Sequence, residues 1–366
     1  MIFSYFYTNI MLAITMIIPL LILGKTREYF NFLITIVLIP LYLFGMLRSF
    51  GVDIDNYRRL YEMNDNFVDV GFNLLMFPFQ FTGMPFEIFL FSVGIFNLIL
   101  VYKITKRLDV NFGIVFFIFL LHIIIVRDFA QLRVGLAINI ALYAYFCSKR
   151  WKYLIYVLAI SVHLTVVILI VILTAYKIFE KRRMALSFLA ITLLIWPIIS
   201  LNLIILAVID PRIELYMSWQ RQGYGESVHT YVQPLFVIFL LLIYLLQNSK
   251  NLISLKLTKI DIFIFSLLHA LVIFVSFSQY AIFAYRLTNV AISLYPFFIA
   301  SIMKNCNSSI TYRLCVFVSL LFVLDQRSNK DAIINYSMEI KDYTCQYCGK
   351  SCCRDYTILR IWDITQ

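Results

Sequence analysis

The run PFEIFLFSVGIFNLILVYKIT, residues 85–105, is almost unbroken in its apolar character and leads into a basic cluster. A helix needs about 20 such residues to cross the roughly 30 Å hydrocarbon core of a bilayer. Similar runs recur on both sides of it, and the chain is 62% hydrophobic and 14% charged. Soluble domains are about 45–50% apolar and about 25% charged. Composition therefore excludes a soluble fold and predicts an integral membrane protein.

The length of these runs predicts helices, because the strands of a membrane barrel are about half as long and alternate polar with apolar residues. We expect an all-α, polytopic protein with about 11 to 12 transmembrane helices. The stretch 71–84 is too short to cross and predicts an interfacial or re-entrant piece. The expected spans are 2–23, 29–47, 85–105, 110–126, 132–147, 151–177, 184–208, 230–248, 261–279, 286–303 and 310–324.

The formal net charge of +11 is distributed in a way that excludes nucleic acid as a partner. The basic residues lie in short loops between apolar runs, which the positive-inside rule assigns to the cytoplasm. The loops 48–70 and 209–229 carry acidic residues instead, so we expect them to face outward, together with the N-terminus. The basic positions are Lys25, Arg27, Lys103, Lys106, Arg107, Lys149, Arg150, Lys152, Lys177, Lys181, Arg182, Arg183, Lys250, Lys256 and Lys259.

The segment 151–177 is long enough for one crossing but has basic clusters at both ends. We therefore expect a broken or re-entrant helix pair that turns near Ser161, Val162 and His163. Broken helices at membrane depth survive only where they line a protein-enclosed or watery cavity. This interpretation places His163 at the apex of the pair.

The chain divides into a multi-spanning membrane domain, residues 1–324, and a polar tail, residues 325–366. The tail contains a C-x2-C-x3-C-C array that begins at Cys345. A zinc ribbon would need a second C-x2-C half, which is missing. Disulfides are the commoner outcome on the outer side, where our topology places the tail.

Ionisable side chains inside apolar runs are functional candidates, because each costs at least about 2.5 to 3.5 kcal/mol at the bilayer centre. Arg127 and Arg133 lie near the outer end of a predicted hairpin, and a guanidinium is suited to phosphate oxygens. Arg127 has an alternative role, because it could reach the interface and pair with Asp128. For Arg133 this alternative is weaker, because no acidic residue lies within one turn.

Three histidines and one further arginine complete the intramembrane set. His163 could exchange a proton near neutral pH, although a hydrogen-bonded core histidine remains the alternative. His122 and His269 fit the core role better, and Arg286 begins a later span. The D-x-D triplet at Asp53 is short and faces outward, where nucleotide sugars are not supplied, so no metal site is expected.

The stretches Gly45–Tyr57 and Val70–Leu75, in the first third of the chain, resemble elements of the EpsG/Wzy family of bacterial polysaccharide polymerases. The loop Gly45–Tyr57 is similar to the family's R-x-x-G-x-D-x-x-x-Y element. Val70–Leu75 is similar to its E-x-G-[YF]-x-x-[LI] stretch, with Asp69 and Val70 where an acid and a spacer usually stand.

Two later stretches extend the resemblance in the same order. Gln131–Ala137 resembles the arginine helix, commonly R-Q-x-[LI]-A, with Val134 in place of Gln. Ile160–Thr165 resembles the histidine element, often F-H-x-[ST], which follows downstream. Together the four stretches place roughly residues 1–305 in the resemblance, and the tail has no counterpart.

The resemblance implies a metal-independent glycosyltransferase without a cofactor. It would join repeat units carried on undecaprenyl diphosphate, at the outer face of the bacterial cytoplasmic membrane, into O-antigen, capsule or exopolysaccharide. Its partners would be that lipid-linked oligosaccharide, the bilayer, and a chain-length regulator and flippase of the same pathway. The implied catalytic residues are Arg133, His163 and Arg127, and the implied substrate-binding residues are Arg48, Asp53, Tyr57 and Arg286.

Three other functions remain open from the sequence. An O-antigen ligase shares this arrangement but typically has a long late outer loop, and the loop 209–229 is short. A sugar acyltransferase would place its histidine near the cytoplasm, whereas His163 is expected outward. A flippase or transporter predicts inverted repeats and cavity charges in both halves, and neither is visible.

Overall fold

The computed structural model describes residues 38–46, 54–63, 69–119, 132–148, 150–178, 182–201, 235, 237–242, 259–278 and 280–305. All regular structure in these ranges is helical, which agrees with the predicted all-α class. The longer elements are α3 (Ile39–Met46), α4 (Ile54–Glu62), α5 (Val70–Phe81), α6 (Phe86–Leu108), α7 (Phe112–Phe119), α8 (Leu132–Cys147), α9 (Lys152–Val162), η3 (Leu164–Val166), α10 (Val167–Ile178), α11 (Arg182–Leu201), α15 (Lys259–Ser276), α16 (Ala281–Ile292) and α17 (Tyr295–Asn305).

The helix α6 is the described helix that is long and apolar enough to cross a membrane. Its 23 residues span about 34 Å, which exceeds the roughly 30 Å of hydrocarbon. It ends three residues beyond the predicted span, where Lys106 and Arg107 stabilise the negative end of the helix dipole and Asp109 turns the chain with φ +58°. Several shorter apolar helices surround it.

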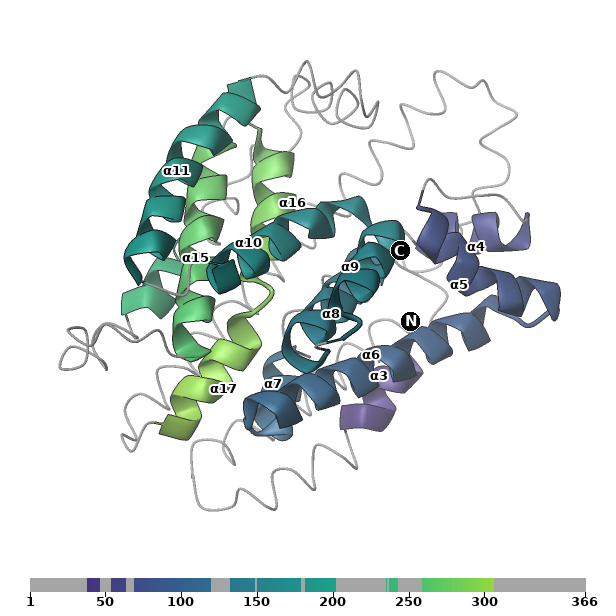
Figure 1. Ribbon diagram of the computed structural model, residues 1–366. Coiled ribbons are helices and arrows are strands. Elements are labelled where there is room, and N and C mark those ends of the chain that lie inside the picture. The colour runs from purple at the N-terminus through teal and green to yellow at the C-terminus, as the bar shows by residue number, and fades with distance from the viewer. Residues whose placement is uncertain are drawn as a thin grey trace, which may run out of the picture.

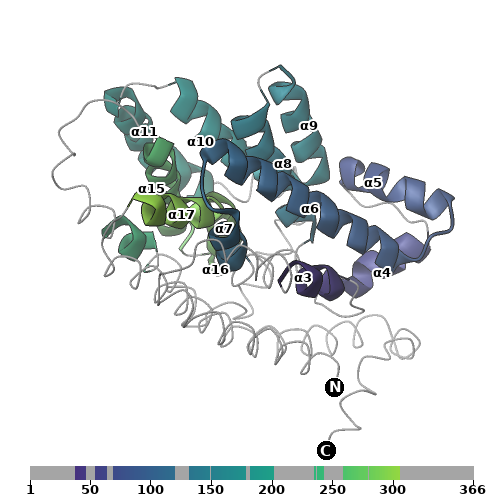
Figure 2. The ribbon, with the colours of Figure 1, turned by 90° about the horizontal axis from the view of Figure 1, so that it is seen from below.

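The helices form two groups, joined by α10 and by the contact of α7 with α17 (Figure 1). In one group α6 packs against α8, α8 packs against α9, and α5 packs against the outer side of α9. In the other group α15 lies between α11 and α16. The view from below shows α4 and α5 at the far end from α11 and α15 (Figure 2). Residues that are distant in the chain therefore meet around α8 and α9.

A buried amide pair connects α6 to α8. Asn139 Nδ2 donates to Asn97 Oδ1 over 3.1 Å, and both side chains are 1% exposed. We expect Asn97→Leu to destabilise the fold by about 1 to 3 kcal/mol, because it leaves the Asn139 amide buried without this partner. Thermal unfolding in detergent would measure the loss, and the double variant with Asn139→Leu is expected to recover most of it. A double variant no more stable than the single one would contradict this account.

The predicted break in the segment 151–177 is present. α9 ends at Val162, His163 is extended at φ −162° and ψ 122°, and one turn of 3-10 helix leads into α10. α10 then departs from the line of α9 (Figure 1). The break was predicted within a residue, while re-entry into the membrane stays a prediction.

The structure divides the predicted span 286–303 into two helices. α16 ends at Ile292, where the Ser293 hydroxyl donates to the Val290 carbonyl over 2.6 Å. Pro296 follows in the first turn of α17, where a missing N–H costs nothing, whereas inside one continuous helix it would remove a bond and clash. The prediction of one continuous helix was therefore wrong here, because hydropathy is insensitive to a break between two equally apolar helices, while the crossing itself stays a prediction.

Candidate functional site

Four polar side chains from four different elements meet at one place beside α8. They are Tyr57 of α4, Asp69 just before α5, Arg133 in the first turn of α8, and His163 just after α9. Arg133 Nη1 forms an ion pair with Asp69 Oδ2, and His163 Nδ1 lies 3.4 Å from the same oxygen. The Asp69 carboxylate is therefore shared between a cation and an imidazole. We call these four residues the Asp69 cluster.

Asp69 occupies the N-cap position of α5 but does not cap it. Its backbone carbonyl accepts from Phe72 and Asn73, whereas its side chain makes no capping hydrogen bond. A capping aspartate typically stabilises a helix by about 0.5 to 2 kcal/mol relative to alanine. The carboxylate instead lies against Arg133 with its side chain 5% exposed. Asp69 therefore contacts Arg133 and His163 and does not stabilise the start of α5 as a cap. A local rule broken in this way is typical of a functional position.

Arg133 is held from two sides. Its Nε donates to the Tyr57 hydroxyl over 3.4 Å, and its guanidinium carbon lies 5.3 Å from the centre of the Tyr57 ring. The side chain remains 20% exposed, so part of it is accessible. A guanidinium has five N–H donors in a planar fork, so it can hold a carboxylate along one edge and phosphate oxygens along another.

His163 is oriented by Asp69. An ionised carboxylate only accepts hydrogen bonds, so the imidazole donates from Nδ1 to Asp69 Oδ2. In the neutral ring, the proton on Nδ1 leaves Nε2 as the acceptor. A histidine with this tautomer can accept a proton from a substrate hydroxyl, and the side chain is 15% exposed.

Gly71 explains how Asp69 reaches His163. A Cβ atom at Gly71 would lie 2.7 Å from the carbonyl carbon of Ser161 and 2.8 Å from the nitrogen of Val162. The start of α5 therefore touches the backbone at the end of α9, which only glycine permits. This contact holds the residues just before α5 beside those just after α9.

The structure brings together three of the predicted site residues, namely Arg133, His163 and Tyr57. Arg286 lies half-buried on α16, and that helix contacts η3, the turn directly after His163. Arg127, Arg48 and Asp53 lie outside the described residues, as does the tail 325–366.

Asp69 is the member that sequence reasoning did not select. It was noted only as the acid that precedes Gly71 in a resembling stretch. Its partners are 64 and 94 residues away in sequence, so their contact was not visible. The available signal was an acidic residue, Asp69, two positions before Gly71 at the start of an apolar helix.

His269 agrees with the core role expected for it. It is 1% exposed on α15, its Nδ1 lies 2.8 Å from the Phe265 carbonyl, and its Nε2 lies 3.3 Å from the Thr192 hydroxyl. Both ring nitrogens thus have polar neighbours inside the helix packing. His122 lies outside the described residues.

These features define an all-helical, strongly apolar protein with a charged cluster set among its helices. The sequence model of the EpsG family matches residues 30–338, and the chain belongs to this family. No curated protein and no solved structure matches the chain. Family membership and the apolar helices together support membrane association and a role in polysaccharide biosynthesis.

Proposed function

We propose that the protein polymerises oligosaccharide repeat units carried on undecaprenyl diphosphate, and that the Asp69 cluster is its catalytic centre. The observation that carries this proposal is the meeting of Arg133, Asp69 and His163 in one place. A cation suited to a diphosphate stands there beside a histidine whose tautomer is fixed by a carboxylate. Such a cation can stabilise a departing diphosphate, and such a histidine can accept the proton of an attacking hydroxyl.

Arg133 binds the diphosphate of the donor in this mechanism. A hydroxyl oxygen of the acceptor repeat unit forms a bond to the anomeric carbon of the donor sugar. The bond between that carbon and the diphosphate oxygen breaks, and undecaprenyl diphosphate leaves with the electron pair. The guanidinium stabilises the negative charge that develops on the leaving oxygen. Arg127 and Arg286 supply further positive charge in this proposal, and Arg48, Asp53 and Tyr57 bind sugar.

His163 accepts the acceptor hydroxyl proton through Nε2, while Asp69 holds Nδ1. Before the reaction, the charges of Asp69 and Arg133 balance each other. Proton transfer makes the imidazole cationic at the moment when the diphosphate gains charge. The positive charge of the cluster therefore increases as negative charge develops on the leaving diphosphate. No metal or cofactor takes part in this scheme.

The proposal includes a polytopic topology in the bacterial cytoplasmic membrane, with about 11 to 12 spans in residues 1–324 and the Asp69 cluster facing outward. Large apolar side chains are exposed along α5, α9 and α11, which suits helices in contact with lipid acyl chains. A chain-length regulator and a flippase of the same pathway would be its partners. The exposed residues are Val70, Leu74, Phe77, Phe81, Tyr153, Leu154, Val157, Leu194 and Ile198.

The polymerisation proposal is tested by the length of surface polysaccharide on a gel. A strain that lacks the gene is complemented with wild type or with empty vector. A ladder of lengths restored by wild type supports polymerisation. Single capped repeat units in both strains would mean that another protein polymerises. If the strain with empty vector makes free polymer but attaches none of it to the surface lipid, the protein would be a ligase instead.

The role of His163 gives a separate prediction. We expect His163→Gln to lower kcat by about 10²- to 10³-fold, because glutamine cannot accept the proton. KM for the repeat unit should change little, since glutamine keeps a polar side chain in contact with Asp69. Initial rates with purified protein in nanodiscs would measure both constants. A folded variant with wild-type kcat would remove His163 from the mechanism.

A further inference from the structure

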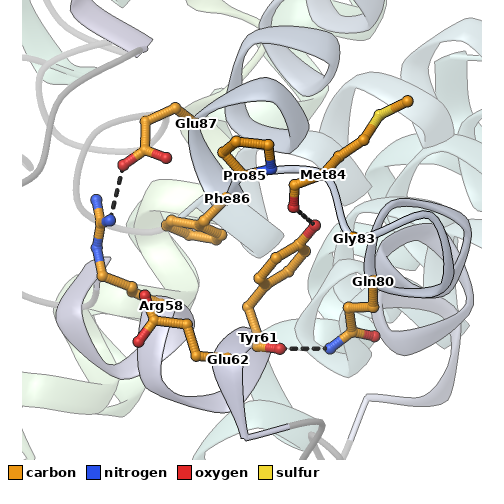
Figure 3. Close-up of a pocket in the computed structure, with 9 residues that line it drawn as sticks. All are labelled: Arg58, Tyr61, Glu62, Gln80, Gly83, Met84, Pro85, Phe86 and Glu87. Carbon is orange, nitrogen blue, oxygen red and sulfur yellow. Dashed lines mark hydrogen bonds and ion pairs between the residues drawn. The ribbon is translucent and has the colours of Figure 1, made fainter.

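A pocket of about 300 Å³ lies between α4, the turn that links α5 to α6, and the first turn of α6 (Figure 3). Pockets that bind small molecules cover about 300 to 1,000 Å³, so this one suits a single sugar ring better than an oligosaccharide or a lipid chain. Its lining residues are Arg58, Tyr61, Glu62, Gln80, Gly83, Met84, Pro85, Phe86 and Glu87.

The walls of the pocket are fixed by their own contacts. Arg58 Nη1 pairs with Glu87 Oε1 over 2.7 Å, Gln80 Nε2 donates to the Tyr61 carbonyl over 3.0 Å, and the Tyr61 hydroxyl donates to the Met84 carbonyl over 2.6 Å. Burial raises the pKa of that hydroxyl, and the charge of Glu87 adds to the effect, so Tyr61 stays a donor. Figure 3 shows Tyr61 linked by dashed lines to Met84 and to Gln80. The polar groups are therefore positioned before any ligand arrives.

One donor in the wall is left over. Arg58 Nη2 is buried and has no hydrogen-bond partner, although Nη1 is paired. The guanidinium carbon lies over the Phe86 ring, 5.4 Å from its centre. A buried N–H without an acceptor is unfavourable, so a small movement of the partly exposed Arg58 side chain that brings Nη2 to an acceptor oxygen of a ligand would be favoured.

The charges of the lining decide the class of ligand. Glu62 and Glu87 carry two negative charges against the single positive charge of Arg58, so the pocket disfavours a diphosphate. Carboxylate, amide and guanidinium groups together supply both acceptors and donors for neutral hydroxyl groups. A sugar without charge fits this set.

The pocket adjoins the Asp69 cluster through α4. Tyr57 belongs to the cluster and Tyr61 to the pocket, and four residues along a helix advance about 6 Å. The rings of Phe72 and Phe89 fill the space between, at 5.7 Å from Tyr57 and 6.1 Å from Tyr61 respectively. A sugar in the pocket would therefore not be the reacting one, but another sugar of the same oligosaccharide.

We propose that this pocket is a subsite that binds one uncharged sugar of the acceptor repeat unit. Binding there positions the reacting sugar of the same unit at the Asp69 cluster. The assignment rests on the proposed polymerase function. Arg58 Nη2 and Glu87 contact sugar hydroxyls, and Gln80 contacts the same ring from the opposite wall. The subsite selects which repeat unit is accepted, while the Asp69 cluster performs the transfer.

The test uses the full-length protein in nanodiscs and the lipid-free repeat-unit oligosaccharide, released from its carrier by mild acid. Binding is followed by saturation-transfer NMR, which needs no turnover. We expect Gln80→Ala and Glu87→Gln each to weaken binding about tenfold, the change that loss of one hydrogen bond produces. Arg59→Gln, at an exposed position of α4 outside the lining, should bind like wild type.

The outcomes separate the two proposals. Wild-type binding that survives both pocket variants overturns the subsite even if polymerisation is normal. Binding that is lost in both variants, in a protein that does not polymerise lipid-linked units, keeps the subsite and overturns the polymerase. The variants should also raise KM for lipid-linked units with kcat within about twofold of wild type. A fall in kcat alone would overturn the subsite.

Discussion

Arg133→Gln is expected to abolish polymer formation, with kcat/KM reduced by at least about 10²- to 10³-fold. That is the loss seen when one group that stabilises developing negative charge is removed from an active site. Arg133→Lys should recover only part of the rate, because an ammonium keeps the charge but not the planar fork. The measurement is the rate of chain growth on lipid-linked repeat units, with Arg107→Gln, an exposed arginine at the end of α6, as the matched control.

A loss of activity in Arg133→Gln has a structural explanation that must be separated from the catalytic one. Removing the arginine leaves Asp69 as a buried charge without its ion pair, which can cost about 3 to 5 kcal/mol of stability. The double variant Asp69→Asn with Arg133→Gln removes both charges and should fold better than the single variant. We expect it to remain inactive. A double variant that is stable and active would show that Arg133 only neutralises Asp69.

Gly71→Ala is expected to have the second large effect, although it adds one methyl group. The new Cβ would meet backbone atoms of Ser161 and Val162 at 2.7 and 2.8 Å, so α5 must move away from α9. Overpacking of this kind costs about 1 to 3 kcal/mol. The shift also carries Asp69 away from His163, so activity should fall at least tenfold beyond what the loss of folded protein explains. Thermal unfolding and specific activity per folded molecule would measure the two effects.

Gly94→Ala is the matched control for Gly71→Ala. Its Cβ would lie 2.9 Å from the Cγ atom of the buried Met46 side chain and meets no backbone atom of another helix within 3.5 Å. We expect a smaller loss of stability than in Gly71→Ala, and normal specific activity per folded molecule. Adding Ser161→Gly to Gly71→Ala should not restore function, because the backbone contacts remain after the hydroxyl is removed. Restoration would mean that only the hydroxyl was in the way.

The sequence predicted what depends on local hydropathy and charge. The helical class, the position of α6 and the break at His163 followed from apolar runs and from basic residues at both ends of one segment. The turn between α16 and α17 did not, because Ser293 after the end of α16 and Pro296 in the first turn of α17 change the backbone without changing the hydropathy of the run. The sequence thus predicts which segments are apolar, whereas a break within an apolar helix depends on single residues that hydropathy does not detect.

The site was predicted in part for a similar reason. Arg133 and His163 were selected because each is an ionisable group in an apolar run, where its presence is costly. Asp69 lies at the edge of an acidic loop, where a carboxylate is ordinary, and only the fold shows that it is buried. The Gly71 contact was also invisible, since a close approach of two backbones requires knowledge of both helices. The pocket beside Phe86 arises from three elements that no local pattern connects.

The shared carboxylate has a consequence for the order in which the protein is made. Asp69 leaves the ribosome 64 residues before Arg133, which at about 5 to 20 residues per second is a delay of about 3 to 13 s. His163 follows later still, 94 residues after Asp69. During that interval we expect the carboxylate to stay hydrated, because Arg133, with which it forms its ion pair, has not yet been made. Docking of α5 against α9 is therefore a late step of biogenesis, and a nascent chain stalled before His163 would leave α5 undocked.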